Sequence, residues 1–210
     1  MTHIQAVIFD MDGVLIDARE WHYRALNQAL ALFGLTINRE AHEGGFDGLP
    51  TREKLRRLTE RDGLPPSLHE FINEMKQQYT LQEIWQHCWP VFEHRYALAQ
   101  LSRRGYRLAV ASNSVRQSMD AMLARAQLLP YLQFYLSNED VSRGKPDPEI
   151  YLTAIRQLSL PPEACVVVED NPHGIAAARA AGAHVLIVNS PADVTWPRIR
   201  DFIAFLEARE

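Results

Sequence analysis

The chain is poor in cysteine, in long apolar runs and in net charge, and each shortage excludes a class of protein. Only two of its 210 residues are cysteines, and Cys88 and Cys165 fall in an expected helix and an expected buried strand, which indicates packed, reduced thiols rather than a disulfide or a metal site. No stretch approaches the roughly 20 apolar residues that a membrane helix needs. The net charge of -4 provides no basic face for a nucleic acid backbone. We therefore expect neither a membrane nor a nucleic acid partner.

We also expect no export signal. The first expected strand begins almost at the first residue, with no basic or apolar leader before it, which favours a cytoplasmic location. A composition of 47% hydrophobic and 23% charged residues is typical of a soluble globular protein. The length suffices for one core domain carrying a smaller insert. We expect a monomer.

Five short apolar runs, rich in β-branched residues, alternate with helical patterns. Continuous apolar runs of this kind are typical of strands covered on both faces, as in parallel sheets. The expected strands are 4–9, 107–111, 134–136, 164–168 and 184–188, and the expected helices are 91–104, 115–127, 148–158, 172–181 and 197–208. The alternation predicts an α/β fold with a doubly wound, mainly parallel sheet.

Several helix ends are predicted from single residues. Asp147 and Asn171 each precede a proline, which is the pattern of an N-cap with proline in the first helical position. Ser114, with Gln117 three residues later, matches a capping box. If Ser114 caps this helix, the hydroxyl of Ser112 is left available to a ligand.

Residues 17–88 break the alternation, because they carry helical patterns but no convincing strand. Apolar residues recur there at helical spacing, first from Trp21 to Phe33 and again from Phe71 to Tyr79. We therefore expect an all-α domain of residues 17–88, inserted into an α/β core of residues 1–16 and 89–210.

Chemically active side chains follow four of the expected strands. The segments are Asp10-Met11-Asp12-Gly13-Val14, Ser112-Asn113, Lys145-Pro146-Asp147-Pro148 and Glu169-Asp170. Because the carboxyl ends of parallel strands share one edge of a sheet, groups distant in sequence meet there. Carboxylates, hydroxyls and an ammonium in one place predict a phosphoryl-transfer site.

The two aspartates of the first segment suit different tasks. A carboxylate such as that of Asp10 can attack phosphorus and divide one difficult displacement into two easier ones. Asp12, two residues later, can protonate a leaving oxygen and then deprotonate water. The alternative is an inert turn in which Gly13 supplies an unusual backbone angle. That alternative leaves the other three segments unexplained.

The four segments together resemble the haloacid dehalogenase-like superfamily, most closely its β-phosphoglucomutase-like and phosphoglycolate phosphatase-like subgroup. The most specific matches are residues 9–17, FDMDGVLID, and residues 168–182, VEDNPHGIAAARAAG. The resemblance covers essentially the whole chain, strongly in the core and loosely in the insert. It implies a Rossmann-like core with a helical cap, and an aspartyl-phosphate mechanism with Asp10 as nucleophile and Asp12 as general acid and base.

A magnesium ion is the cofactor that this resemblance implies. Mg²⁺ is usually held by one or two carboxylates together with substrate oxygens and water. Asp10, the main-chain carbonyl of Asp12, and Asp170 match the family's ligands, with Glu169 as a direct or indirect contributor. An alternative role for Glu169 and Asp170 is to cap the next helix, but Asn171 already fills that position.

Two further segments are expected to contact the phosphoryl group. Lys145 can offset charge in the transition state, and the match of GKPDP to the family's third motif favours this over a surface lysine. Ser112 and the backbone amide of Asn113 lie at a strand end that opens onto a helix and form a candidate phosphate cradle. Simple helix capping is the competing interpretation for them.

The insert is expected to select the substrate. Residues 44–52, GGFDGLPTR, form a glycine-rich loop entering a helix, and the corresponding loop of the resembling proteins reaches over the site. Arg52 and Lys54 are candidates for contacting a second anionic group, with exposed helix positions as the equal alternative. His22 resembles the mutase's site-facing histidine in position, although a packed, structural histidine is the commoner case.

Magnesium-dependent hydrolysis of a small phosphorylated metabolite, such as a sugar phosphate, is the function that these observations favour. A sugar phosphate mutase is the second hypothesis, weakened by Ala18 and by the spacing of Leu49-Pro50-Thr51. A receiver-type signalling domain with a phosphoaspartate is the hypothesis of another class, and Asp12 and the helical insert argue against it. Dehalogenation needs no leaving-group acid, and a phosphonate hydrolase would need Lys54 or Lys76 as a Schiff-base lysine without supporting context.

Overall fold

The structure, a computed structural model, describes residues 3–46 and 49–208. It divides into two compact units. One combines the chain up to Asp17 with the chain from Trp89 onward, and the other is Ala18–Cys88. The role of the second unit as a substrate-selecting cap stays a proposal.

The first unit is built on a five-stranded sheet in the order β3-β2-β1-β4-β5. Its strands are β1 (Ala6–Phe9), β2 (Arg107–Ala111), β3 (Phe134–Leu136), β4 (Cys165–Glu169) and β5 (His184–Ile187). All four neighbouring pairs are parallel. The predicted α/β fold class is confirmed, and every strand end that carries a candidate site segment lies at the same edge of the sheet.

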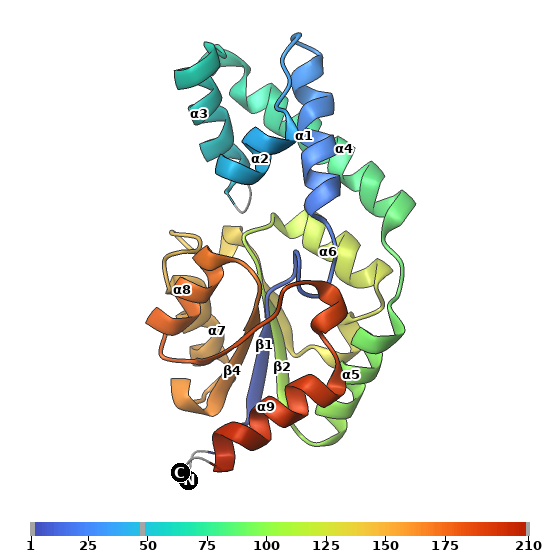
Figure 1. The fold of residues 1–210 in the computed structure, drawn as a ribbon, viewed down its shortest axis with the longest axis vertical. Coiled ribbons are helices and arrows are strands. Elements are labelled where there is room, and N and C mark those ends of the chain that lie inside the picture. The colour runs from blue at the N-terminus through green and yellow to red at the C-terminus, as the bar shows by residue number, and fades with distance from the viewer. Residues whose placement is uncertain (1–2, 47–48, 209–210) are drawn as a thin grey trace. The chain divides into compact units, whose positions relative to one another are not determined.

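Helices cover both faces of this sheet. They are α5 (Phe92–Arg103), α6 (Arg116–Arg125), α7 (Glu149–Leu158), α8 (Pro172–Ala180) and α9 (Trp196–Ala208). Figure 1 shows α7 and α8 on one side of the strands and α5 and α9 on the other. Short 3-10 turns at Leu129–Tyr131, Asn138–Asp140, Pro162–Ala164 and Pro191–Asp193 complete the connections.

One core cluster of the first unit lies between the sheet and the helices α7 and α8. Alternate residues of a strand point to the same face, so Ala6 and Ile8 of β1 share this cluster with Cys165 and Val167 of β4. Burial raises the pKa of the Cys165 thiol to about 11, so this thiol stays protonated at neutral pH. Cys88 is buried as well, as predicted for a packed side chain.

One predicted helix cap is present, the cap predicted at Asp147 is shifted by one residue to Pro148, and the cap predicted at Ser114 is wrong. The Asn171 side chain accepts a hydrogen bond from the amide of His173 at 2.9 Å and caps α8. Ser114 does not form a capping box, because α6 begins at Arg116 after Val115 and has no side-chain cap. The Ser114 hydroxyl instead donates a hydrogen bond to the Asp12 carboxylate.

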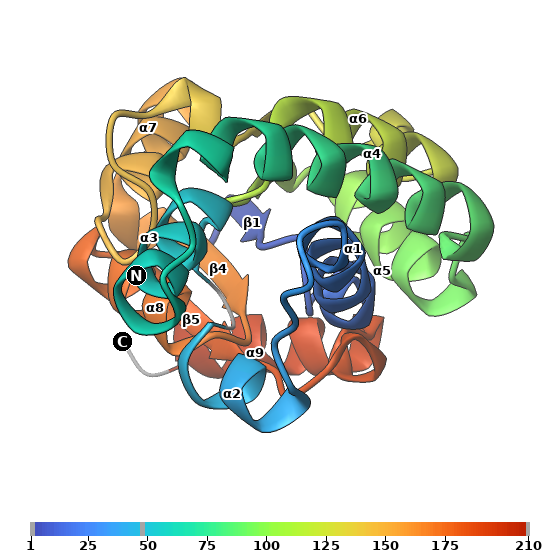
Figure 2. The same cartoon turned by 90° about the horizontal axis from the view of Figure 1, so that it is seen from above.

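The second unit is helical throughout its described residues. It contains α1 (Arg19–Ala31), α2 (Arg39–Gly45), α3 (Thr51–Asp62), a 3-10 turn (Pro66–Leu68) and the long α4 (His69–His87). Helices α1 and α4 pack side by side (Figure 2). The core of this unit contains Leu26, Ala29, Leu30, Ile37, Phe46, Leu55, Leu58, Leu64 and Ile72. Among the described residues of the chain, no helix is long and apolar enough to cross a membrane.

A substitution at Leu158 tests how tightly the core packs at the end of the sheet opposite the candidate site. It is 1% exposed at the end of α7, and its carbonyl accepts a hydrogen bond from Arg107 at the start of β2. Leu158→Ala should lower the free energy of unfolding by about 2–5 kcal/mol, because a cavity replaces the side chain. Urea unfolding measures the loss. The control is Leu152→Ala on the same helix, where the side chain is exposed; equal losses in both variants would contradict this packing.

Candidate active site

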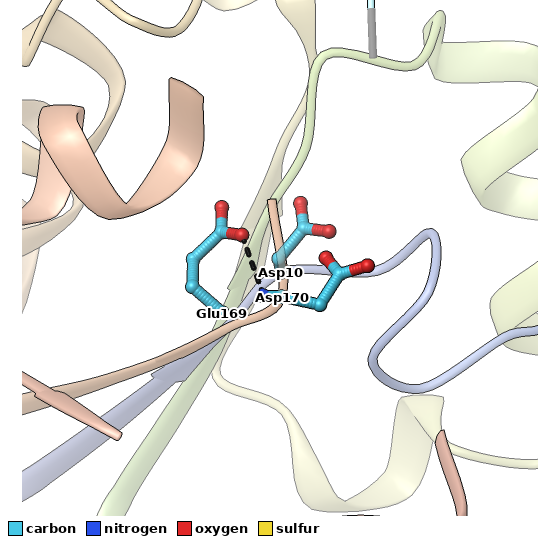
Figure 3. Close-up of side chains that lie close together, drawn as sticks. All are labelled: Asp10, Glu169 and Asp170. Atoms are coloured by element: carbon cyan, nitrogen blue, oxygen red, sulfur yellow. Dashed lines mark hydrogen bonds between the residues drawn. The ribbon is translucent and has the colours of Figure 1, made fainter. Parts of the chain in front are cut away.

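Three carboxylates lie together at the carboxyl edge of the sheet (Figure 3). The parallel register of β1 and β4 pairs Phe9 with Val168, which brings Asp10 beside Glu169 and Asp170. One oxygen from each carboxylate lies within 4.8 Å of the others, a grouping that can hold a metal ion. The Asp12 carboxylate is not part of this group, and its main-chain carbonyl as a ligand stays a prediction.

Lys145 joins two of these carboxylates. Its ammonium donates to Asp10 Oδ1 at 2.6 Å and to Glu169 Oε1 at 2.7 Å. All three side chains are buried. Burial by itself would lower the pKa of Lys145, but the charges of Asp10 and Glu169 outweigh it and raise the pKa, so the lysine stays charged. The structure therefore excludes the surface-lysine alternative.

The surroundings of Asp10 disfavour its ionised form, which a bound cation would stabilise. Burial raises its pKa well above the usual range; Lys145 opposes this rise, and the nearby charges of Glu169 and Asp12 add to it. Three carboxylates and one ammonium leave an excess of negative charge in a buried place. An all-oxygen donor set of this kind suits a hard divalent cation. The residues present therefore fit the metal that the sequence implies.

Glu169 is held by four hydrogen bonds. Its Oε1 accepts from Lys145 and from the Tyr151 hydroxyl, each at 2.7 Å, and its Oε2 accepts from the amides of Asp170 at 3.0 Å and Asn171 at 3.2 Å. A carboxylate has about four acceptor positions. Its orientation is therefore fixed by protein donors. The helix-cap alternative for Glu169 is correct in part, because Glu169 accepts a hydrogen bond from the amide of Asn171, the residue that caps α8.

Asp12 sits in a tight turn and is held by two serines. The turn uses Gly13 with φ +90°, and the amide of Gly13 donates to the carbonyl of Ile16. Asp12 Oδ2 accepts from the Ser114 hydroxyl at 2.6 Å and from the Ser112 hydroxyl at 3.3 Å. The contact of Ser114 with Asp12 was not predicted, because the sequence pattern places the Ser114 side chain in a helix cap.

The Asn113 side chain also has a role that no sequence pattern predicted. Its Oδ1 accepts from the amide of Lys145 at 2.9 Å, and its Nδ2 donates to the carbonyl of Lys145 at 3.2 Å. A Cβ at Gly144 would lie 2.7 Å from the same Oδ1, which explains the glycine before Lys145. The Asn113 backbone amide and Ser112 as a phosphate cradle stay predictions.

The candidate substrate residues of the second unit have different surroundings. Arg52 is exposed, whereas Lys54 is buried, so the exposed-helix alternative is wrong for Lys54. His22 Nδ1 on α1 lies 3.3 Å from Lys76 Nζ on α4. Their contacts with a substrate stay predictions, and Asp47 and Gly48 of the expected substrate loop lie outside the described residues.

Comparison with known proteins decides the family. Residues 7–188 match the family described as haloacid dehalogenase-like hydrolase. The chain belongs to this family. It is 33% identical over 182 residues to a phosphorylated carbohydrates phosphatase of Thermotoga maritima, covering 85% of this chain and 82% of that protein. It is 32% identical to a phosphoglycolate phosphatase of Cupriavidus necator, over 87% of this chain and 80% of the relative.

A solved structure agrees with these relatives. A variant of CbbY from Rhodobacter sphaeroides, in complex with xylulose-(1,5)bisphosphate, superimposes with a TM-score of 0.80 at 26% identity, covering 88% of this chain and 85% of the other. The resemblance predicted from the motifs is confirmed. The enzyme class predicted with it, a hydrolase of phosphoric monoesters within this family, is confirmed as well.

Gly174 tests the packing that fixes Glu169. In a helix, Gly→Ala normally raises stability by about 1 kcal/mol. At Gly174, however, the new Cβ would lie 1.7 Å from Glu169 Oε1. We expect Gly174→Ala to lower the urea midpoint of unfolding instead.

The control for this variant is Gly44→Ala in α2, where no atom lies within 4 Å of the added Cβ. It should leave the midpoint unchanged or raise it. Stabilisation of both variants to the same extent would show that α8 does not press on Glu169.

Proposed function

We propose that the protein is a magnesium-dependent phosphatase that hydrolyses a small, sugar-like phosphate ester through a phosphorylated Asp10. The observation that carries this proposal is the buried contact of Lys145 with both Asp10 and Glu169, beside Asp170. A nucleophilic carboxylate, a fixed cation and an acidic cluster are the groups that phosphoryl transfer needs.

Asp10 and Asp170 are the principal residues for holding the magnesium ion, with the main-chain carbonyl of Asp12. Glu169 contributes mainly by holding Lys145, because its acceptor positions are already filled. When bound, the ion neutralises charge on the phosphoryl oxygens and orients the ester.

The protein's own residues account for the remaining steps. Asp10 attacks phosphorus, the bond from phosphorus to the leaving oxygen breaks, and that oxygen takes a proton from Asp12. Lys145 meets the charge on the phosphoryl oxygens, with Ser112 and the Asn113 amide as the cradle. Asp12 then removes a proton from water, which attacks the aspartyl phosphate and releases inorganic phosphate and free Asp10. The Ser114 hydroxyl holds Asp12 beside this path.

Relatives support the substrate class. One relative is named a phosphorylated carbohydrates phosphatase, and the CbbY structure contains a sugar bisphosphate. Arg52, Lys54 and His22 remain the candidate residues for selecting among such esters. The predicted cytoplasmic location and monomeric state stay predictions.

Metal-dependent phosphate release is the direct test of this function. Purified protein should release phosphate from p-nitrophenyl phosphate and from part of a panel of sugar phosphates when Mg²⁺ is present. A chelator should abolish the release and excess Mg²⁺ should restore it, because the acidic cluster repels the ester without a cation. Chromatography of the sugar products separates hydrolysis from isomerisation. Isomerised sugar without phosphate release would replace the phosphatase by the mutase.

A covalent intermediate should be detectable in one variant and absent from another. In Asp12→Ala the good leaving group of p-nitrophenyl phosphate departs without an acid, but no base activates water, so phosphorylated Asp10 should accumulate. Intact-protein mass spectrometry should show one added phosphoryl group. The double variant Asp10→Asn with Asp12→Ala should show none, while Asp201→Asn, an exposed aspartate on α9, should turn over normally. Phosphorylation of the double variant would remove Asp10 as the nucleophile.

A further inference from the structure

We propose that Tyr151 is a positioning residue for phosphoryl transfer, whose hydroxyl holds Glu169 in the orientation that keeps Lys145 in place. The inference rests on the proposed phosphatase function. It extends the site to a residue of α7 that follows the lysine by six positions, and it assigns to that residue a role beyond packing.

Tyr151 reaches the ion network from the first turn of α7. It is fully buried, and its hydroxyl donates to Glu169 Oε1 at 2.7 Å. Lys145 donates to the same oxygen at the same distance. The lysine ammonium also lies 4.7 Å from the centre of the Tyr151 ring, within the range of a cation–π contact. Ring and hydroxyl therefore act on both partners of the ion pair.

The hydroxyl completes the set of donors around Glu169. Two backbone amides fix Oε2, and Lys145 and Tyr151 share Oε1. Without the tyrosine hydroxyl, Lys145 alone would define the position of Oε1. The carboxylate could then turn and follow the lysine, so the ammonium would lose the fixed point that places it between Asp10 and the incoming phosphoryl group.

The tyrosine stays a donor at neutral pH. Burial raises its pKa well above the usual value, and the negative charges of Glu169 and Asp10 raise it further. Packing alone does not require the hydroxyl. Tyr151 belongs to the core cluster between the sheet and α7 and α8, and a phenylalanine ring would fill the same apolar space.

The chain offers a matched control in Tyr135 of β3. Its hydroxyl also donates to a carboxylate, Asp120 Oδ1, at 2.7 Å, but this bond is exposed and involves none of the proposed site residues. Tyr151→Phe and Tyr135→Phe therefore each delete a hydrogen bond from a tyrosine hydroxyl to a carboxylate, the first inside the proposed site and the second outside it. With Mg²⁺ and p-nitrophenyl phosphate, Tyr151→Phe should lower kcat by about ten-fold and change KM by less than about two-fold, because it removes support needed in the transition state. Tyr135→Phe should leave both constants at the wild-type values.

Two further measurements separate positioning from a general structural effect. Calorimetric titration with orthovanadate and Mg²⁺ should show weaker binding to Tyr151→Phe than to wild type, because vanadate imitates the transition state. In a Glu169→Gln background, Tyr151→Phe should have little additional effect on kcat, since both changes act through one group. If Tyr151→Phe lowers kcat by the same factor in the Glu169→Gln background as in the wild type, the proposal is overturned.

The outcomes distinguish this inference from the proposed function. A wild-type protein that releases no phosphate contradicts the phosphatase itself. An active wild type, with an equally active, folded Tyr151→Phe, overturns only the role of Tyr151. Thermal unfolding monitors folding of each variant. If Tyr151→Phe is unfolded at the assay temperature, kcat is measured below its unfolding midpoint, where turnover equal to that of the wild type would overturn the proposal.

Discussion

The buried contact of one ammonium with two carboxylates is the interaction on which the rest of the site depends. Removing charges from water costs several kcal/mol per ion, and the pairing of Lys145 with Asp10 and Glu169 offsets that cost only because the geometry is fixed. Removal of one partner from such a network typically costs about 3–5 kcal/mol, because an uncompensated charge stays buried. The fold therefore has to hold all three groups at once.

Three parts of the fold supply that fixation. The register of β1 and β4 places Asp10 beside Glu169. The tight approach of Gly174 presses α8 against the Glu169 carboxylate. Tyr151 extends the network into the core cluster through a helix that directly follows the lysine segment. The packing of the α/β core therefore holds the charged groups at the edge of the sheet in their positions.

The sequence predicted the fold and the central residues well, because both depend on strong, local signals. Apolar runs identified the strands, acidic residues placed directly after two of them identified the shared edge of a parallel sheet, and the GKPDP motif identified Lys145. Asp10, Lys145, Glu169 and Asp170 therefore came together as expected. The approximate helix positions also followed from periodicity and from turn residues.

The remaining details depend on contacts that no local pattern encodes. Ser114 matched a capping box, but its hydroxyl gains a short, charge-assisted bond to Asp12, a residue 102 positions away in the chain. The burial of Lys54 could not be seen in a helix whose neighbours are mostly charged. Tyr151 had the appearance of an ordinary core residue, because its hydroxyl partner belongs to another strand-to-helix connection. Each of these cases required the long-range contact itself.

The two hydrogen bonds between the Asn113 side chain and the main chain of Lys145 limit which side chains position 113 accepts. Outside a sheet, a residue has no neighbouring strand to satisfy its backbone amide and carbonyl, and here one planar carboxamide pairs with both of these groups of Lys145. An aspartate of the same size has no hydrogen to give to the carbonyl, and a longer glutamine would place both atoms beyond the peptide. The backbone of the segment that carries Lys145 is therefore held by a single amide group from the loop after β2.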